Sequence, residues 1–159
     1  MLSQVTSQKN ILQPGQQAPD FSLETHRGQT ISLVQELLKS PVVLFFYPKN
    51  NTAVCTKQAC SFRDAFADFK TLNVTLLGIS SDSIQSHQQF SEKHQLPFLL
   101  LSDSDYQVAK QYGIKKTLGI LPGRVTFVID QKQTIQLAYN DAFNHNAHIE
   151  KALHCVKHL

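Results

Sequence analysis

The sequence predicts an α/β fold in which helices cover a central mixed β-sheet, and three observations support this prediction. Short apolar runs of strand length alternate with amphipathic stretches of helical period. Two of these runs, Val42–Tyr47 and Val74–Ile79, are apolar at nearly every position, as expected of strands buried on both faces. Near the end of the chain, two further runs flank a short polar turn, and a last helical stretch follows them.

The N-terminal part predicts a flexible arm followed by a small hairpin. Residues 1–14 are polar, and residues 15–159 contain no repeat, linker or shift in composition that marks a second domain. We therefore expect an arm over 1–14 and a single domain over 15–159. Within the domain, Phe21–Leu23 and Thr30–Leu33 have strand character around a turn at Arg27-Gly28, which predicts an N-terminal β-hairpin.

The following elements are bounded by residues that end or begin helices and strands. Val34–Lys39 has helical character and stops at Ser40-Pro41, and the buried strand Val42–Tyr47 stops at Pro48. From Cys55 onward the pattern is helical. Its apolar stripe recurs at three and four residues and consists of Phe62, Ala65, Phe66 and Phe69.

The second half of the chain continues the alternation of helices and strands. After the strand Val74–Ile79, the expected elements are a helix over Ser83–His94, a strand over Phe98–Leu101, a helix over about Asp105–Tyr112, a β-hairpin of Val125–Ile129 and Thr134–Ala138 around Asp130–Gln133, and a helix over about Asn146–Lys157. The thioredoxin fold fits this order of elements.

The composition is that of a soluble globular protein. Hydrophobic residues make up 42% and charged residues 17%, and the net charge of +3 is scattered rather than gathered into the basic stripe that nucleic acid requires. No apolar run reaches the length of a membrane span, and the N-terminal segment lacks the apolar middle of a secretion signal. We therefore expect a cytoplasmic protein that binds neither nucleic acid nor a membrane.

Three cysteines are the candidate reactive groups, and their odd number argues against a secreted disulfide framework. Cys55 follows a loop after a central strand and lies just inside a predicted helix start, where N–H groups and the helix dipole stabilise a thiolate. A free thiol is only about 3% ionised at neutral pH, so ionisation alone accelerates its reactions by at most roughly thirty-fold. A fast reaction also needs hydrogen-bond donors aimed at the reacting oxygens.

Two residues of the preceding loop are candidates for shaping this site. Thr52 places a hydroxyl three residues before Cys55, where it serves either as the helix N-cap or as a group that contacts the substrate. Pro48 restricts the loop and screens the thiolate from water, although ending a strand explains this proline equally well.

Cys60 lies five residues after Cys55, on the same predicted helix. In an intact helix this separation puts the two Cα atoms roughly 8–9 Å apart and on different faces. A disulfide requires about 7 Å or less, so the pair bridges only if the first helical turn unwinds. The spacing by itself is equally compatible with a cysteine that only packs in the core.

The active-site segment resembles that of peroxiredoxins, and is most similar to the peroxiredoxin Q or bacterioferritin comigratory protein subfamily. The family's Pro-x-x-x-Thr-x-x-Cys pattern is present as Pro48, Thr52 and Cys55, and the subfamily's second cysteine is present as Cys60. Further similar segments, at the expected order and spacing, are Gly78–Ser83, Leu96–Asp103 and Arg124–Asp130. The likeness runs from about Gly15 to the last helix.

This resemblance implies a thioredoxin-fold peroxidase. Cys55 would attack hydrogen peroxide or a small organic hydroperoxide to form a sulfenic acid, and Cys60 would resolve it as a disulfide. Arg124 would be the active-site arginine, whereas from the residues alone a solvated strand end is the expectation. Thioredoxin or glutaredoxin would be the reductant, no metal, flavin or haem cofactor is needed, and similar proteins are often monomers.

Two departures from the subfamily concern the residues around Cys55. Ala53-Val54 replaces the usual Pro-Gly before the cysteine, and Gln58 replaces the usual Glu three residues after it. The first change alters the stiffness of the loop and the second removes a charge near the active site. Activity is expected to survive both changes, with an altered rate.

Two alternatives belong to other functional classes. A thiol–disulfide oxidoreductase or redox sensor shares the fold, but such enzymes favour Cys-x-x-Cys, whereas four residues separate Cys55 from Cys60. A metal-binding protein is suggested by a cluster near the last helix, in which two histidines share one helical face. The cluster consists of His145, His148, His154, Cys155 and His158.

Overall fold

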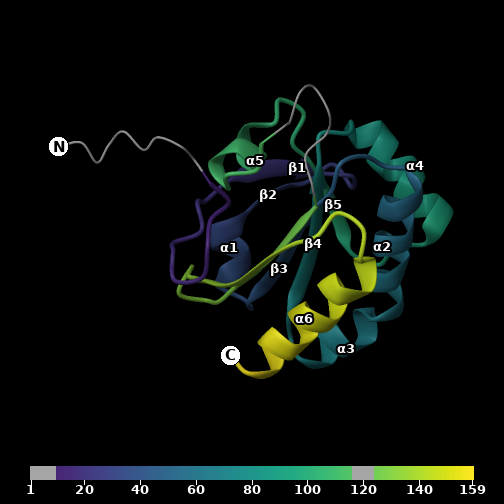
Figure 1. Cartoon of the computed structure of the whole chain (residues 1–159). Helices are drawn as coiled ribbons and strands as arrows, with labels where there is room; N and C mark the ends of the chain where they lie inside the picture. The colour runs from purple at the N-terminus through teal and green to yellow at the C-terminus, as the bar shows by residue number, and fades with distance from the viewer. Residues whose placement is uncertain (1–9, 116–123) are drawn as a thin grey trace.

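The computed structural model describes residues 10–115 and 124–159 (Figure 1). Residues 1–9 of the expected N-terminal arm lie outside the described residues, so most of that prediction stays untested. Within the described part, Gly15 and Ala18 N–H groups donate to the carbonyls of Ile135 and Gln133, which ties the start of the domain to the second strand of the C-terminal hairpin and the turn before it.

The described residues form one mixed sheet in the strand order β2-β1-β5-β4-β3-β6-β7. The strands β3, β4 and β5 run parallel at its centre, and antiparallel strands flank them on both sides. The strands are β1 Ser22–Thr25, β2 Thr30–Ser32, β3 Val42–Phe46, β4 Thr75–Ser80, β5 Leu99–Ser102, β6 Val125–Ile129 and β7 Ile135–Asn140. This arrangement is the predicted thioredoxin fold, including its N-terminal hairpin β1–β2.

Helices cover both faces of the sheet, as Figure 1 shows. The helices are α1 Leu33–Leu37, α2 Ala53–Asp64, α3 Phe66–Thr71, α4 Ile84–His94, α5 Gln107–Gln111 and α6 His145–Lys157. Residues of α1 and α5 belong to one hydrophobic core, and residues of α2, α3, α4 and α6 belong to the other. The sheet therefore separates two apolar layers, and the helix that carries Cys55 lies in the second.

The central strand β3 feeds both cores because successive side chains of a strand point to opposite faces. Val42, Leu44 and Phe46 belong to the first core, and Val43 and Phe45 to the second. All five residues of β3 are buried, which explains why its sequence is apolar throughout.

The ring of Phe45 stacks on that of Phe62 in α2, with centroids 4.4 Å apart and planes 16° apart. This contact holds α2 against the sheet. It depends on Gly78 in β4, because a Cβ atom there would lie 2.8 Å from the Phe45 ring and 3.0 Å from Leu100. The missing side chain at Gly78 thus lets the Phe45 ring lie close to β4, and this ring holds α2, the helix that carries Cys55, against the sheet.

The structure differs from the predicted elements at one helix. The stripe of Phe62, Ala65, Phe66 and Phe69 predicts one continuous helix, but the chain breaks into α2 and α3 at Ala65, whose φ and ψ are −94° and 1°. The interruption lasts one residue, and a break of that length leaves the period of three and four residues nearly intact. The apolar pattern therefore could not reveal the break at Ala65.

Among residues 10–115 and 124–159, none of the helices has the length and apolar character that crossing a membrane requires.

We predict that Gly78→Ala destabilises the protein by about 1–3 kcal/mol, because the added methyl group overpacks the space held by Phe45 and Leu100. Denaturant unfolding measures the change in the free energy of unfolding. In a Phe45→Leu background the same substitution should cost clearly less, since the ring that it meets is gone. Equal costs in the two backgrounds would contradict this account of Gly78.

Candidate active site

Cys55 lies in the first turn of α2, close to the carboxyl end of β3. The loop of residues 47–52 joins the two elements and is followed by only two helical residues before Cys55. The residue is 2% exposed and belongs to the second core. Helix N-terminal N–H groups stabilise negative charge, and burial restricts access to small reactants.

Arg124 places its guanidinium group against the sulfur atom of Cys55. Its Nη1 donates to Cys55 Sγ at 3.3 Å and to Gln58 Oε1 at 3.0 Å. Its Nε donates to the backbone carbonyl of Ala142 at 2.9 Å. Arg124 is 5% exposed, which differs from the solvated strand end that the residues alone predict. These three contacts satisfy the Nε and Nη1 donors of the guanidinium, which lowers the cost of its burial.

The register of the sheet brings Arg124 to Cys55. Phe46, the last residue of β3, pairs with Val125, the first residue of β6, so the residue before β6 lies beside the loop that follows β3. The backbone also helps, because the Asp141 N–H donates to the Arg124 carbonyl at 3.3 Å. Residues 69 positions apart in the sequence thus meet at one edge of the sheet.

Arg124 is a buried cation without a carboxylate partner. Within residues 10–115 and 124–159, the ion pairs found are Lys39–Glu36 and Arg63–Asp64, and neither involves it. The oxygen atoms of Gln58 and Ala142 that it contacts are neutral. A buried unpaired charge costs several kcal/mol, so a negatively charged group that came to lie beside this guanidinium would be stabilised.

His148 supports Arg124 from α6. Its Nε2 contacts the Asp141 carbonyl at 2.8 Å and its Nδ1 lies 2.8 Å from the Thr126 hydroxyl. Since a carbonyl only accepts, Nε2 carries the proton and Nδ1 accepts from Thr126. Burial lowers the pKa of His148, and the charge of Arg124 contributes to the shift. A neutral imidazole therefore fixes the 141–142 segment that holds the arginine.

A buried polar network holds the loop between β3 and α2. The Tyr47 hydroxyl donates to Asn50 Oδ1 at 2.6 Å, and Asn50 Nδ2 donates to His87 Nδ1 at 3.0 Å. His87 Nε2 then donates to the Leu101 carbonyl at 3.0 Å, and the Asn50 N–H donates to the Asp82 carboxylate at 2.9 Å. The chain of donors works only with neutral His87.

Burial keeps this network uncharged at His87 and Tyr47. It lowers the pKa of His87 to about 4, and it raises the pKa of Tyr47 well above 10. Both side chains therefore keep the protonation states on which the network depends at neutral pH. The hydrogen bonds of Tyr47 and His87 that hold the loop before Cys55 therefore do not change near pH 7.

Thr52 occupies the N-cap position of α2 but does not cap it with its side chain. Its hydroxyl donates to the Lys49 carbonyl at 3.0 Å instead, and the residue is exposed. The prediction of a capping hydroxyl is wrong because this bond closes a local turn in the loop. Pro48 is half-buried at the end of β3.

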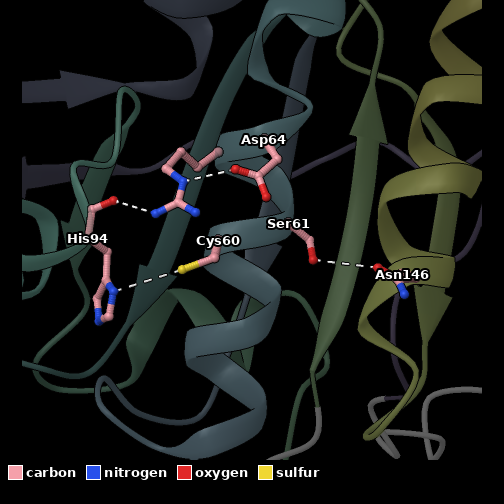
Figure 2. Close-up of polar contacts among 6 residues, drawn as sticks. Cys60, Ser61, Asp64, His94 and Asn146 are labelled. Carbon is pink, nitrogen blue, oxygen red and sulfur yellow. Dashed lines mark hydrogen bonds and ion pairs between the residues drawn. The ribbon is translucent and has the colours of Figure 1, made fainter.

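Cys60 lies five residues further along the unbroken α2 helix, with its sulfur 3.8 Å from His94 Nδ1 (Figure 2). All three cysteines are free thiols, and Cys55 and Cys60 cannot form a disulfide while α2 is intact. The next residue, Ser61, has its hydroxyl 3.1 Å from His145 Nδ1 and 3.5 Å from Asn146 Oδ1, which ties α2 to α6. The structure thus brings Arg124 to Cys55 but leaves Cys60 apart from it.

The histidine cluster near the C-terminus makes a different set of contacts. The rings of His154 and His158 lie 4.5 Å apart, and His158 Nδ1 donates to the His154 carbonyl at 2.8 Å. Burial raises the pKa of Cys155 in the same helix. In the described part of the chain, no three His, Cys, Asp or Glu side chains gather in a way that could hold a metal ion.

Comparison with known proteins decides the family. The AhpC/TSA family matches residues 14–138. The chain belongs to the AhpC/TSA family of peroxiredoxins. This peroxiredoxin is 43% identical to chloroplastic peroxiredoxin Q of Populus jackii over 146 residues, which cover 91% of this chain and 68% of that protein. It is 42% identical to chloroplastic peroxiredoxin Q of Sedum lineare, again over 91% of this chain, and over 78% of that protein.

A solved structure agrees with this assignment. Peroxidoxin BcpB from Mycobacterium tuberculosis superposes with a TM-score of 0.87 at 36% identity, over 93% of this chain and 98% of that one. The thioredoxin fold and the resemblance to peroxiredoxin Q are therefore confirmed. This peroxiredoxin is a thiol-dependent peroxidase, an enzyme class that acts on peroxides and is reduced by thioredoxin-type partners.

The expectation of a cytoplasmic protein is wrong by the same comparison. The relatives from Populus jackii, Sedum lineare and Arabidopsis thaliana are chloroplastic, which points to a plastid location. The sequence favours the cytosol only by default, because bulk composition does not distinguish one aqueous compartment from another.

Several residues around the site escape prediction from the sequence. Asn50 and His87 show no motif, although a histidine three residues before Phe90, on the apolar face of a predicted helix, is a weak signal of a buried polar contact. His148 and Thr126 are also missed, since their pairing joins two distant elements. Gln58 is noticed only as a departure from the family pattern.

We predict that acid weakens the fold through His87. Its pKa is about 4 when folded and 6.5 in the unfolded chain, so the unfolded chain binds the proton more readily. The free energy of unfolding is unaffected by His87 above pH 6.5, and falls by about 3 kcal/mol as pH drops from 6.5 to 4. Urea unfolding across this range measures the slope. The slope should shrink in His87→Gln but not in the exposed control His158→Gln, and equal slopes would contradict the assignment.

We predict that Gln58→Glu slows the reduction of hydrogen peroxide by this peroxidase roughly tenfold at pH 7, a change of about 1.4 kcal/mol. The Gln58 Nε2 atom has no hydrogen-bond partner among the described residues, so the substitution breaks no bond there. It adds a carboxylate that takes up the charge of Arg124 otherwise directed at Cys55. Stopped-flow kinetics give the rate. The matched control is Gln89→Glu on the exposed face of α4, and an unchanged rate in Gln58→Glu would contradict the prediction.

Proposed function

We propose that Cys55 is the nucleophile of this peroxidase and that Cys60 resolves its oxidised form. The Cys55 thiolate attacks one oxygen of the peroxide, forming an S–O bond while the O–O bond breaks. The other oxygen leaves as hydroxide or alkoxide and takes up a proton. Cys55 is oxidised to a sulfenic acid by two electrons, and the peroxide is reduced to water or an alcohol.

The contact between Arg124 and Cys55 carries this proposal. The pair is buried, its atoms are 3.3 Å apart, and the described residues offer the guanidinium no carboxylate. In a low-dielectric site the charge of Arg124 stabilises the thiolate and the negative charge that develops on the leaving oxygen. The proposed reaction requires both the thiolate nucleophile and a stabilised leaving oxygen.

Thr52 and Pro48 shape the approach to the sulfur. The Thr52 hydroxyl donates a hydrogen bond to the Lys49 carbonyl. The lone pairs of its oxygen therefore remain free to accept a hydrogen bond from the O–H of an incoming peroxide. Pro48 closes the end of β3 and keeps water from the thiolate. The Cys55 N–H, at the start of α2, is a further donor toward the peroxide oxygens.

Resolution by Cys60 needs local unwinding, since both cysteines lie on the intact α2 helix. The N-terminal turn is the weaker end, because it has neither a side-chain cap nor an acidic residue. The C-terminal half is anchored by buried Phe62 and by the contacts of Ser61 and Arg63. We therefore propose that Cys55 moves to Cys60 as the first turn opens.

The proposed substrates are hydrogen peroxide and small organic hydroperoxides, because Cys55 is only 2% exposed and admits little bulk. Thioredoxin is the proposed reductant of the Cys55–Cys60 disulfide, with glutaredoxin as a second candidate. We propose a monomer, because large exposed hydrophobics are few; in the described residues these are Val34, Leu38, Phe143 and Leu159. Light scattering tests the monomer directly.

We predict different losses for the cysteines in a coupled assay that follows NADPH oxidation with thioredoxin, its reductase and hydrogen peroxide. Cys55→Ser loses turnover by more than about a hundredfold, because no nucleophile remains. Cys60→Ser consumes about one equivalent of peroxide and then stops, because no disulfide reaches thioredoxin. Cys155→Ser is the matched control and keeps full turnover.

Equal cycling in wild-type protein and Cys60→Ser would contradict the role of Cys60. Peroxide consumption that survives Cys55→Ser would contradict the role of Cys55. If Cys55 is oxidised by peroxide but neither thioredoxin nor glutaredoxin restores it, the redox-sensor alternative replaces the cycle.

A further inference from the structure

The thiol of Cys60 faces a histidine rather than the core. Its sulfur lies 3.8 Å from Nδ1 of His94, the last residue of α4 (Figure 2). Cys60 and His94 are both half-buried, so the imidazole can exchange a proton with water while one face stays in contact with the sulfur. The two residues are 34 positions apart in the sequence, and their contact joins α2 to α4.

His94 is held in place by its neighbours. The Arg63 guanidinium donates through Nη1 to the His94 carbonyl at 2.9 Å, while its Nε contacts Asp64 Oδ1 at 3.0 Å. The imidazole packs edge-on against the ring of Phe90, with centroids 5.0 Å apart. Backbone and ring are thus fixed independently, and the position of Nδ1 beside Cys60 follows from both.

The charges around His94 keep it neutral near pH 7. Burial lowers its pKa, and the positive charges of Lys93 on its own helix and Arg63 on α2 lower it further. The nearby carboxylate of Asp64 is engaged by Arg63. In the neutral tautomer that carries its proton on Nε2, the Nδ1 atom that faces the thiol is a free acceptor for the thiol proton.

We propose that His94 is the general base of the resolving step, accepting the proton of the Cys60 thiol. This inference rests on the proposed function. As the proton moves to Nδ1, the Cys60 sulfur attacks the Cys55 sulfur, an S–S bond forms and the S–O bond of the sulfenic acid breaks. The departing hydroxide takes up a proton from the imidazolium and leaves as water, so His94 returns to its neutral form.

A base is needed in the resolving step because the thiolate, not the thiol, is the nucleophile. A free thiol is only about 3% ionised at neutral pH, and Cys60 lies well away from the arginine that serves Cys55. A base at contact distance removes this limit. Its largest benefit is about thirty-fold at pH 7 and vanishes at high pH, where the thiol ionises without help.

The test separates the two chemical steps in a single turnover. Reduced protein is mixed with one equivalent of hydrogen peroxide and quenched by alkylation, and mass spectrometry follows the sulfenic acid and the disulfide between pH 5.5 and 9. The variants are His94→Phe, which keeps the stacking on Phe90, and His94→Gln, which keeps a polar side chain that cannot take up a proton. His158→Phe is the matched control.

For wild type and His158→Phe, we expect disulfide formation to be nearly constant above neutral pH and to fall as pH drops through the lowered pKa of His94. Both His94 variants should form the sulfenic acid at the wild-type rate but the disulfide about tenfold more slowly at pH 7. Their rates should rise about tenfold per pH unit and so meet the nearly constant wild-type rate near pH 8.

Two results would overturn the proposal. One is a set of equal rates with equal pH profiles in wild type and both variants. The other is an equal slowing at every pH, which would mark His94 as a packing residue. The failure of the proposed function looks different, since wild-type protein would then form no sulfenic acid on Cys55 or no Cys55–Cys60 disulfide at any pH.

Discussion

The buried contact between the Arg124 guanidinium and the Cys55 sulfur is the interaction on which the rest of the site depends. It requires β6 to lie antiparallel beside β3 in the observed register, and it requires α2 to start where β3 ends. It also requires neutral surroundings, which Gln58 and the Ala142 carbonyl provide. A positive charge that is removed from water and given no carboxylate is costly by itself, and in the proposed mechanism a negative charge on the sulfur offsets this cost.

The remaining structure supports this contact from two sides. Neutral His148 joins Thr126 of β6 by hydrogen bonds to the 141–142 segment that holds the arginine. Neutral His87 joins Asn50, in the loop before Cys55, by hydrogen bonds to the backbone of β5. Further away, the Phe45–Phe62 stack presses α2 onto the sheet. Histidines here act as fixed, uncharged hydrogen-bond relays because burial suppresses their protonation.

The elements themselves could be predicted from period and composition, since Val42–Phe46 and the helix Ile84–His94 owe their form to local pattern and to cap residues such as Ser83. Cys55, Thr52 and Pro48 could be selected as candidate site residues because the cysteine follows a loop at a predicted helix start, and Cys60 because of its spacing from Cys55. Arg124 could be selected only through the family resemblance, because it shows no local sign of burial. The Thr52 hydroxyl bond, the break at Ala65 and the pairings of His87, His94 and His148 could not be predicted. The three histidine pairings depend on which distant backbone or side chain arrives nearby, and a single sequence does not contain that information. The Thr52 bond and the break at Ala65 are local, but the periodicity of the sequence does not distinguish them from a capped, continuous helix.

In the proposed cycle, the placement of both cysteines on one ordered helix means that two reactions compete for the sulfenic acid of Cys55. Opening of α2 is a first-order event with a rate that belongs to the protein, whereas a second peroxide that attacks the waiting sulfenic acid does so at a rate proportional to its concentration. Below some peroxide level the helix opens first and the thiol is recovered; above it, sulfinic acid accumulates and the molecule is lost to the cycle. The helical stability of residues 53–64 therefore determines how much oxidant this protein survives.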